Sequence, residues 1–402
     1  MLILVEQTKV SRRNSLYPDL DHLCFLSKNL YNATLYRVRQ HFFGTKQFLR
    51  YADINKMMIA ERNPDYYALN TKVSQQTQKL VDQNYRSFFG SLKSKNKRKN
   101  GVKMPKYLKK DDRQVVMFTK QAVSTVVKGY IKLGGTKILI PTKQTDIQFV
   151  RLVPHSSYIT VEVGYRKETP EYVDNDRYAA IDLGIANLAT LTFFDDKPII
   201  FNGKPVKSIN QYYNKKLAEL KSKQSKSKSP YRNTNRMNAL TSKRYNKIKD
   251  YMHKTSREIV NQLVSHNVNN LIIGYNKGWK QDTNLGKVNN QKFVQIPFLM
   301  FINMLMYKCK LAGIRCEAIQ ESHTSKCSFL DHEEICHHDK YLGRRIHRGL
   351  FKSATGQVIN ADINGSLNIL RRFLNVAKNI NIYDFVDLVE VCSTPTVFTV
   401  KL

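Results

Sequence analysis

Acidic residues are scarce in this sequence. Of its 402 residues only 32 are Asp or Glu, against 66 Lys or Arg, which gives a formal net charge of +34. Such an excess repels itself in a compact fold unless a polyanion shares it, and nucleic acid is the polyanion that we expect. The basic residues are spread through the chain, which favours nucleic acid over two alternatives: a ribosomal or chromatin-like protein, or one drawn to an anionic membrane.

Long apolar runs and paired cysteines are also missing. No apolar run reaches the length of about 18 residues that a membrane span needs. The apolar start MLILV has neither a basic region before it nor a cleavage site after it. None of the six cysteines stands in Cys-x-x-Cys spacing. We therefore expect free thiols, no membrane segment and a reducing cytoplasm.

The residues that are present indicate a globular protein of several domains. A chain of 402 residues with 42% hydrophobic and 10% aromatic residues is long enough for two or three domains. Residues 115–165 contain six short runs rich in β-branched residues, which is typical of a small barrel or sandwich. Met1–Val5 predicts one more strand. Apolar residues at helical spacing from Asp19 onward, and again from about Thr71 to Leu92, predict two helices inserted between the first and second strands.

The second half predicts a different architecture. From Arg177 the pattern gives three short strands and then helix, strand, helix, strand and helix, which is the order of an RNase H-like fold. A Cys/His-rich insertion precedes the last helix, and the final apolar and acidic stretch is left unassigned. The expected fold class is therefore multidomain α+β, with a β unit interrupted by helices followed by an α/β domain.

Three acidic residues lie at informative points in that order. Asp182 stands inside an apolar run, where an unpaired carboxylate is costly unless a Lys or Arg or a metal ion compensates it. Glu321 follows a later strand, and Asp362 opens the last helix. Singly, each acid fits an ion pair, and Asp362 a helix N-cap. Together they predict a catalytic site for two Mg²⁺ (or Mn²⁺) ions that hydrolyses phosphodiesters.

Two basic clusters are candidates for nucleic-acid binding. The first combines lysines and an arginine with one aromatic ring, a pattern that suits phosphate clamping and base stacking, although a solvated loop remains the alternative. Its members are Lys93, Lys95, Lys97, Arg98, Lys99, Lys103, Lys106 and Tyr107. The second cluster lies in the insertion and consists of Arg344, Arg345 and Arg348.

Five motifs carry a resemblance to a known family. The stretches AAIDLGIANLAT, LIIGYNKGWKQDTN, ESHTSKCSFLD, YLGRRIHRGLF and NADINGSLNIL resemble the TnpB (OrfB) proteins of bacterial insertion sequences, which are relatives of compact type V CRISPR nucleases. The resemblance covers essentially the whole chain. It implies an RNA-guided DNA endonuclease whose partners are a guide RNA and a double-stranded DNA target. It also implies a separate transposase encoded by the same element.

The resemblance further implies a domain layout. A wedge-like β-barrel would comprise residues 1–16 and 113–170, interrupted by a helical recognition domain at 17–112. A RuvC-like nuclease domain would comprise 177–321 and 359–376. Residues 322–358 would be a target-nucleic-acid-binding insertion at a zinc-ribbon position, and 377–402 a C-terminal tail.

One departure from the family pattern concerns the middle catalytic acid. Many relatives carry a glutamate just after the LIIG-type strand, where this chain has Asn276. An amide does not supply the carboxylate's charge, so the role passes to Glu321, with Asp282 as a weaker substitute. If neither acid reaches the site, the protein is an RNA-guided DNA-binding protein without cleavage. A third interpretation is an unguided transposon-associated nuclease.

The other departure concerns zinc. Relatives commonly have two Cys-x-x-Cys pairs between the second and third acidic motifs, which form a zinc site. Here the second pair is absent and the remaining spacings are irregular. The possible ligands are Cys327, His332, Cys336, His337, His338 and His347. We therefore expect a metal-free remnant of the zinc ribbon at this position.

Overall fold

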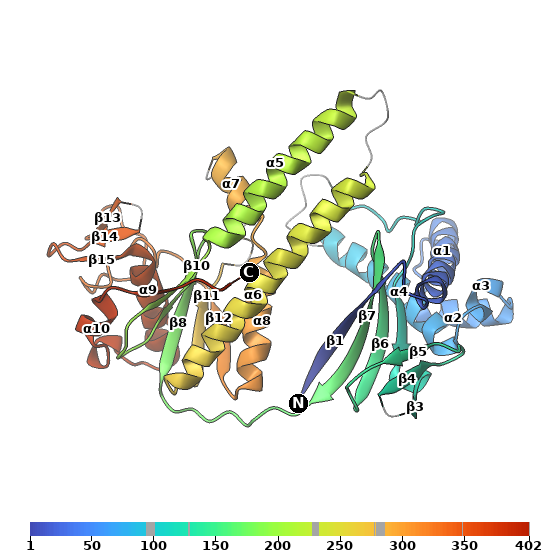
Figure 1. Cartoon of the computed structure of the whole chain (residues 1–402), viewed down its shortest axis with the longest axis horizontal. Coiled ribbons are helices and arrows are strands. Elements are labelled where there is room, and N and C mark those ends of the chain that lie inside the picture. Colours follow the sequence, from blue (N-terminus) through green and yellow to red (C-terminus); the bar gives the residue numbers. More distant parts are fainter. Residues whose placement is uncertain are drawn as a thin grey trace. The chain divides into compact units, whose positions relative to one another are not determined.

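A computed structural model describes residues 1–93, 101–127, 129–226, 233–276, 278, 286–347 and 349–401. The chain divides into two compact units, Met1–Glu168 and Thr169–Leu402, which are described separately below (Figure 1). Within the described ranges, none of the helices combines the length and the apolar character that crossing a membrane requires.

The first unit is built on a four-stranded antiparallel sheet with the order β1-β7-β6-β2. Its strands are β1 (Leu2–Ser11), β2 (Val116–Thr119), β6 (Ile147–Pro154) and β7 (Tyr158–Lys167). The first strand of the unit pairs with the last along its whole length, from Leu2 opposite Lys167 to Ser11 opposite Tyr158. The first and last strands of the unit are therefore hydrogen-bonded neighbours, and its other elements lie between them in the sequence.

The predicted barrel is not confirmed. Strands β1 and β2 are the two edges of the sheet, and no pairing between them occurs in the part of the chain that the structure describes. Three further strands, β3 (Val123–Val127), β4 (Tyr130–Leu133) and β5 (Leu139–Pro141), form a separate antiparallel sheet. Their connections are short, so neighbours in sequence pair with one another.

Four helices lie between β1 and β2 in the chain. They are α1 (Tyr17–Thr45), α2 (Tyr51–Ala60), α3 (Pro64–Tyr67) and α4 (Thr71–Lys93). Buried residues of α1 and α4, such as Leu30 and Val73, share one apolar core with Phe118 and Val150 of the sheet. Burial of apolar area of this kind is the main stabilising contribution, at roughly 25 cal/mol per Å².

The second unit contains the remaining elements. They are β8 (Tyr178–Leu183), β9 (Asn187–Thr192), β10 (Ile199–Asn202), α5 (Lys204–Lys226), α6 (Asn235–Ser265), β11 (Asn270–Gly274), α7 (Lys287–Val294), α8 (Phe298–Leu311), β12 (Arg315–Ile319), β13 (Arg344–His347), β14 (Leu350–Lys352), β15 (Val358–Asn360), α9 (Ala361–Ala377), α10 (Leu388–Cys392) and β16 (Thr396–Phe398). Residues 382–384 form a 3₁₀ turn.

A six-stranded sheet with the order β12-β11-β8-β9-β10-β16 forms its centre. Strands β8, β9 and β10 are an antiparallel meander, whereas β11 and β12 run parallel to β8. Strand β16 comes from the tail that the sequence left unassigned, and it pairs in parallel with β10.

Helices cover both faces of this sheet. Figure 1 shows α9 on one side and α6 and α8 on the other. Strand β8 follows the same division, because Ala179 and Ile181 belong to the core with α6 and α8, whereas Tyr178 and Ala180 belong to the core with α9. Side chains alternate along a strand, so Asp182 falls on the α9 face.

Helices α6 and α8 bury one cation between them, and this predicts a pH effect on stability. Lys308 is 4% exposed, and its Nζ donates to His253 O at 2.5 Å and Ser256 Oγ at 2.7 Å. Burial, followed by the charge of Arg257, lowers the pKa of Lys308 from 10.5 to about 8. Below pH 8 the buried charge destabilises the fold. Between pH 8 and 10.5 the native state loses this proton before the unfolded state does, so stability rises with pH.

The measurement is the melting temperature of wild type and Lys308→Met between pH 7 and 10. We expect the free energy of unfolding of the wild type to rise relative to that of the variant as pH rises, by up to roughly 3 kcal/mol. Lys310→Met is the matched control, because Lys310 lies on the same helix and is exposed. A difference between Lys308→Met and wild type that does not change with pH would contradict the prediction.

Candidate active site

Asp182 and Asp362 meet where β8 packs on α9. A Cβ atom placed on Gly365 of α9 would lie 2.7 Å from Asp182 Oδ2, so the helix approaches this carboxylate closely. Asp362 lies one turn before Gly365. Asn360 is the N-cap of α9, since its Oδ1 accepts from Asp362 N at 2.9 Å and Ile363 N at 3.3 Å. The carboxylate of Asp362 is therefore not used for capping.

Glu321 reaches the same edge of the sheet from the end of β12. Strand β12 pairs with β11 up to Gly274 opposite Ile319. A Cβ atom on Gly274 would collide with Glu321 Oε2, so the Glu321 side chain lies across the end of β11. Asn276 accepts a hydrogen bond from Glu321 N through its Oδ1 at 3.1 Å. Glu321 Oε2 is buried and, among the described residues, has no hydrogen-bond partner.

The charges of Glu321 and Asp362 act on the carboxylate of Asp182. Burial raises the pKa of Asp182 well above its ordinary value, and the negative charges of Glu321 and Asp362 raise it further. The nearby Arg345 acts in the opposite direction but does not cancel the effect. Burial also raises the pKa of Glu321 to about 7. Carboxylates that resist ionisation in this way mark a place where additional positive charge is stabilising.

The donor chemistry fits a divalent cation, although the side chains do not form a complete ligand set as they stand. In the described ranges no group of three or more His, Cys, Asp or Glu side chains is arranged to hold a metal ion. The fit rests on the buried Oε2 of Glu321, which has no partner among the described residues, and on the negative charges of Glu321 and Asp362 acting on Asp182. Oxygen ligands of this type suit Mg²⁺ or Mn²⁺.

Two further residues contact the carboxylates. Asn187, the first residue of β9, donates from Nδ2 to Asp362 Oδ2 at 2.7 Å. Arg345 of β13 brings its Nη2 to 3.9 Å from Asp362 Oδ1. Asn187 was not predicted as a site residue; the sequence indicates only that it lies in the turn after the strand that contains Asp182. Arg345 was predicted to bind nucleic acid, but its position beside Asp362 was not predicted.

Two protein-family models match separate stretches of this chain. A family model described as a probable transposase, OrfB of IS605, matches residues 158–280. A second model, described as the TNB domain of Cas12f1-like proteins, matches residues 298–369. The TnpB-like protein ORF457 of Acidianus two-tailed virus is 23% identical over 416 aligned positions, covering 90% of this chain and 84% of the viral protein. These matches make the chain similar to TnpB (OrfB) proteins over most of its length.

A solved structure shares the fold of this chain. The protein in the cryo-EM structure of a Cas12f1–sgRNA–target DNA complex superposes with a TM-score of 0.55 and 13% identity, covering 88% of this chain and 82% of that one. At this identity the likeness concerns the fold alone. It shows that this chain has a mixed α+β fold like that of Cas12f1.

The described members of the first predicted basic cluster lie in the first unit. Lys93, Lys103, Lys106 and Tyr107 are exposed. The guanidinium of Arg39 stacks over the Tyr107 ring at 5.0 Å. The following residue, Leu108, is fixed to α1, since its backbone N and O both hydrogen bond with the side chain of Asn32 at 2.9 Å. Lys95, Lys97, Arg98, Lys99, Asp282 and Arg348 lie outside the described residues.

The insertion at 322–358 is organised around a buried acid. Glu333 is 4% exposed, and its carboxylate accepts from Ser328 N and from Leu342 N, both at 2.7 Å. Phe329 and Phe351 bury their rings in the core with α9. The thiol of Cys336 lies 3.3 Å from His338 Nε2. Arg344 of β13 is exposed. These contacts account for the local structure, and the absence of zinc stays a prediction.

The close approach of α9 to Asp182 predicts the effect of one substitution. We expect Gly365→Ala to lower the melting temperature, because the added Cβ meets Asp182 Oδ2 at 2.7 Å and overpacking costs about 1–3 kcal/mol. Gly90→Ala is the matched control, since Gly90 also lies in a helix and its added Cβ meets nothing within 4 Å. The control should gain up to about 1 kcal/mol from helix propensity. Equal gains in both variants would show that Gly365 has room for a methyl group.

Proposed function

We propose that this protein is an RNA-guided DNA endonuclease of an insertion sequence, which hydrolyses DNA phosphodiesters with two divalent metal ions. Asp182, Glu321 and Asp362 would hold the metals. The observation that supports the proposal is the action of the Glu321 and Asp362 charges on the buried Asp182, together with one buried oxygen of Glu321 that has no partner among the described residues. The strand order β10-β9-β8-β11-β12, with α9 on the face that carries Asp182, supports a RuvC-like nuclease domain.

The proposed partners are a guide RNA and a double-stranded DNA target. Two observations support them: the net charge of +34, and a fold shared with a protein solved in complex with sgRNA and target DNA. Neutralising phosphates with Lys and Arg releases counterions and drives such binding. The same proposal includes a separate transposase encoded by the element, so that this chain cuts DNA but does not join it.

Each residue of the site has a proposed part in the reaction. Asp182, Glu321 and Asp362 would hold the metal ions, whose chemistry would be to activate a water at neutral pH and to stabilise the leaving oxygen. Asn187 orients Asp362 through its 2.7 Å hydrogen bond, and Asn276 holds the backbone of Glu321. Arg345 carries a positive charge beside Asp362, where it would contact the scissile phosphate. The burial that raises the pKa values of Asp182 and Glu321 also limits the access of bulk water.

The test is cleavage of matched DNA by protein purified with its co-expressed RNA. We expect Mg²⁺-dependent cutting that EDTA removes and that RNase treatment of the complex abolishes. Cutting that survives RNase indicates an unguided nuclease. The absence of cutting with Mg²⁺ and Mn²⁺, despite RNA-dependent binding of the same DNA, overturns the endonuclease proposal.

That last outcome defines the second candidate, an RNA-guided DNA-binding protein without cleavage. Asn276 favours it, because it occupies the position of an acid in many relatives and lies at the site as an uncharged amide. The lack of a complete ligand set among the described residues favours it as well. A gel-shift assay run beside the cleavage assay separates the two candidates.

A further inference from the structure

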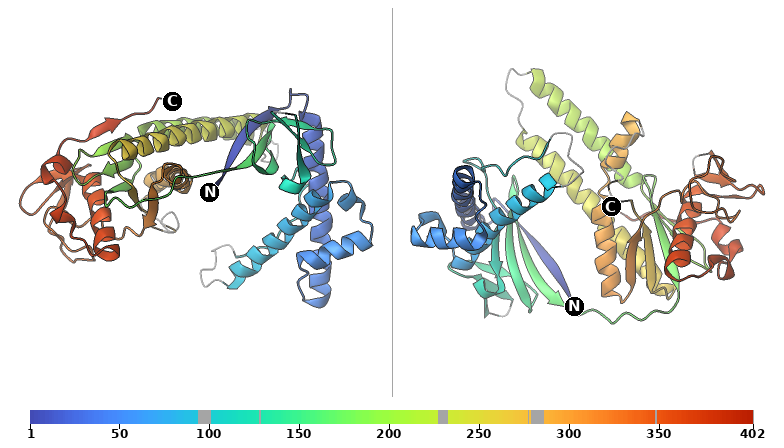
Figure 2. Two further views of the ribbon diagram at one scale, coloured as in Figure 1. Left: turned by 90° about the horizontal axis from the view of Figure 1, so that it is seen from below. Right: turned by 180° about the vertical axis from the view of Figure 1, so that it is seen from behind.

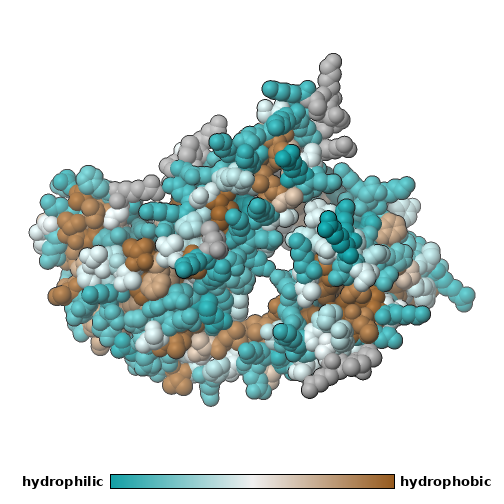
Figure 3. All heavy atoms as spheres, in the orientation of Figure 1, coloured by the Kyte–Doolittle hydropathy of each residue, from teal (hydrophilic) through white to brown (hydrophobic). Residues whose placement is uncertain are grey.

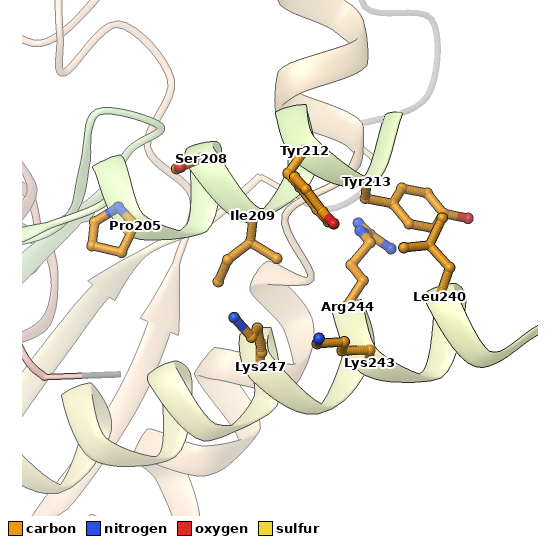
Figure 4. A pocket seen from close by; sticks show the side chains of 9 residues that line it. All are labelled: Pro205, Ser208, Ile209, Tyr212, Tyr213, Leu240, Lys243, Arg244 and Lys247. Carbon is orange, nitrogen blue, oxygen red and sulfur yellow. The ribbon is translucent and has the colours of Figure 1, made fainter. Parts of the chain in front are cut away.

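Helices α5 and α6 form a hairpin whose facing side chains leave a cavity. Figures 1 and 2 show both helices extending beyond the sheet. Residues at helical spacing line the cavity, which has a volume of about 460 Å³ and is shown in Figure 4. They are Pro205, Ser208, Ile209, Tyr212 and Tyr213 of α5, and Leu240, Lys243, Arg244 and Lys247 of α6. This volume lies within the range of small-ligand pockets, roughly 300–1,000 Å³.

The charge around this cavity, which we call the hairpin pocket, is positive and unbalanced. Arg244 donates to Asn210 Oδ1 at 2.6 Å and to Gln295 O at 3.0 Å, and both acceptors are neutral. Burial lowers the pKa of the Arg244 guanidinium. Among the residues that the structure describes, no carboxylate forms an ion pair with Arg244, Lys243 or Lys247. An anion in the pocket would balance these three charges.

The same pocket presents aromatic and apolar surface. Tyr212 is 58% exposed, and Figure 4 shows its ring directed between the two helices. Ile209 and Leu240 line the pocket beside it. Figure 3 shows apolar side chains between the helices, while hydrophilic ones cover much of the rest of the hairpin. The ring of Tyr213 already stacks with Arg244 at 5.0 Å, which leaves Tyr212 as the available ring.

We propose that the hairpin pocket binds one unpaired nucleotide of a single-stranded nucleic acid, with its base on Tyr212 and its phosphates on Lys243 and Lys247. The ligand must be both anionic and flat, and a nucleotide is both. A base held in a duplex is stacked and paired and does not enter such a pocket. This inference rests on the proposed nucleic-acid function. It adds to that function a contact made by residues other than the three carboxylates.

A neighbouring cavity gives the strand a path along the hairpin. It has a volume of about 360 Å³ and shares Tyr212 and Leu240 with the hairpin pocket. Lys216, Lys223 and Arg236 line it, together with one acid, Glu219, which pairs with Lys216 at 3.0 Å. Nucleotides adjacent to the bound one would therefore meet further cations, as an electrostatic groove for single strands requires.

The experiment measures the affinity of the full-length protein for fluorescent single strands of about 12 nucleotides, as RNA and as DNA, each also made with abasic sites. We expect Tyr212→Ala to weaken binding roughly tenfold, because base stacking on an aromatic contributes about 1–3 kcal/mol. Tyr245→Ala is the matched control, since Tyr245 is 49% exposed on α6 and does not line the pocket. It should change affinity less than about twofold, as a surface substitution does.

The abasic strands separate base stacking from phosphate binding. We expect Tyr212→Ala to have no effect on abasic strands, whereas Lys243→Ala and Lys247→Ala weaken binding to intact and abasic strands alike. Each lysine variant should also reduce the salt slope by about 0.7. An effect confined to RNA identifies the RNA strand as the ligand, and an effect confined to DNA identifies an unpaired DNA strand. Equal behaviour of Tyr212→Ala and Tyr245→Ala, or an equal loss on abasic strands, would overturn the proposal.

Because this readout is binding alone, it does not depend on cleavage. If the nuclease proposal fails, the Tyr212 effect on single-strand affinity remains measurable. If the pocket proposal fails, the cleavage assay of the carboxylates is unaffected.

Discussion

We expect Asp182→Asn to reduce DNA cleavage by a factor on the order of a thousand, the effect of losing a principal electrostatic group in an active site. The substitution keeps the shape of the side chain and removes only the charge that the proposed metals require. Asp182 lies where the negative charges of Glu321 and Asp362 converge with its own. Removing it therefore leaves two carboxylates, too few to fix a pair of metal ions.

The same variant should be more stable than the wild type in EDTA. The folded state raises the pKa of Asp182, so the ionised form opposes folding. This cost is absent below the ordinary pKa of Asp, about 3.9, and grows as pH rises above it. We expect a higher melting temperature for Asp182→Asn at pH 8 and none of this difference near pH 3, as measured by thermal denaturation. Loss of cleavage together with increased stability excludes misfolding as the cause.

Asp195→Asn is the matched control for this experiment. Asp195 is an exposed acid of the same unit, and it pairs with Arg177 at 3.0 Å. It should keep full cleavage activity and change stability by less than about 1 kcal/mol, as expected for a surface ion pair. Full cleavage by Asp182→Asn would remove the carboxylate site from the proposed mechanism.

The second large effect is expected at Glu321. Glu321→Gln should reduce cleavage by about a hundredfold or more, because the buried Oε2 that lacks a described partner is the oxygen best placed to gain a metal ligand bond. Asn276→Ala should have a smaller effect, about tenfold or less, since Asn276 contacts only the backbone N of Glu321 in the described hydrogen bonds. The measurement is the single-turnover cleavage rate with saturating Mg²⁺.

Glu317→Gln controls for the loss of a charge on β12. Glu317 lies on β12, the strand that precedes Glu321, and it forms an ion pair with Arg315. Its cleavage rate should equal that of the wild type. The assignment of the middle acid to Glu321 fails if Asn276→Ala is the more damaging of the two substitutions.

The sequence predicted the elements with strong periodicity and missed those fixed by distant contacts. The apolar alternation around Asp182 and the run LIIG gave strands close to the observed Tyr178–Leu183 and Asn270–Gly274. Helix α4 was predicted within one residue of its end at Lys93. Strand β16 was missed because its three residues become a strand only through pairing with β10. Helix α2, Tyr51–Ala60, was missed because its apolar stripe is short.

The candidate site shows the same limit. The three acids were predicted because Asp182 lies in a strand, Glu321 follows one and Asp362 opens a helix, and such points meet at one edge of a sheet in this element order. The contacts from Asn187 and Arg345 to Asp362 were not predictable, since they depend on how α9 and the insertion pack. The choice between a barrel and an open sheet was not predictable either, because it depends on whether distant edge strands pair.

The pairing of β16 with β10 affects the order in which this protein folds during synthesis. The hydrogen bond from Asn202 Nδ2 to Thr399 Oγ1 joins residues 197 positions apart. The ribosome therefore delivers β10 long before its neighbour, and in that interval the strand is an open edge able to pair with another chain. The nascent second unit is consequently most exposed to aggregation until Thr396–Phe398 emerges and docks.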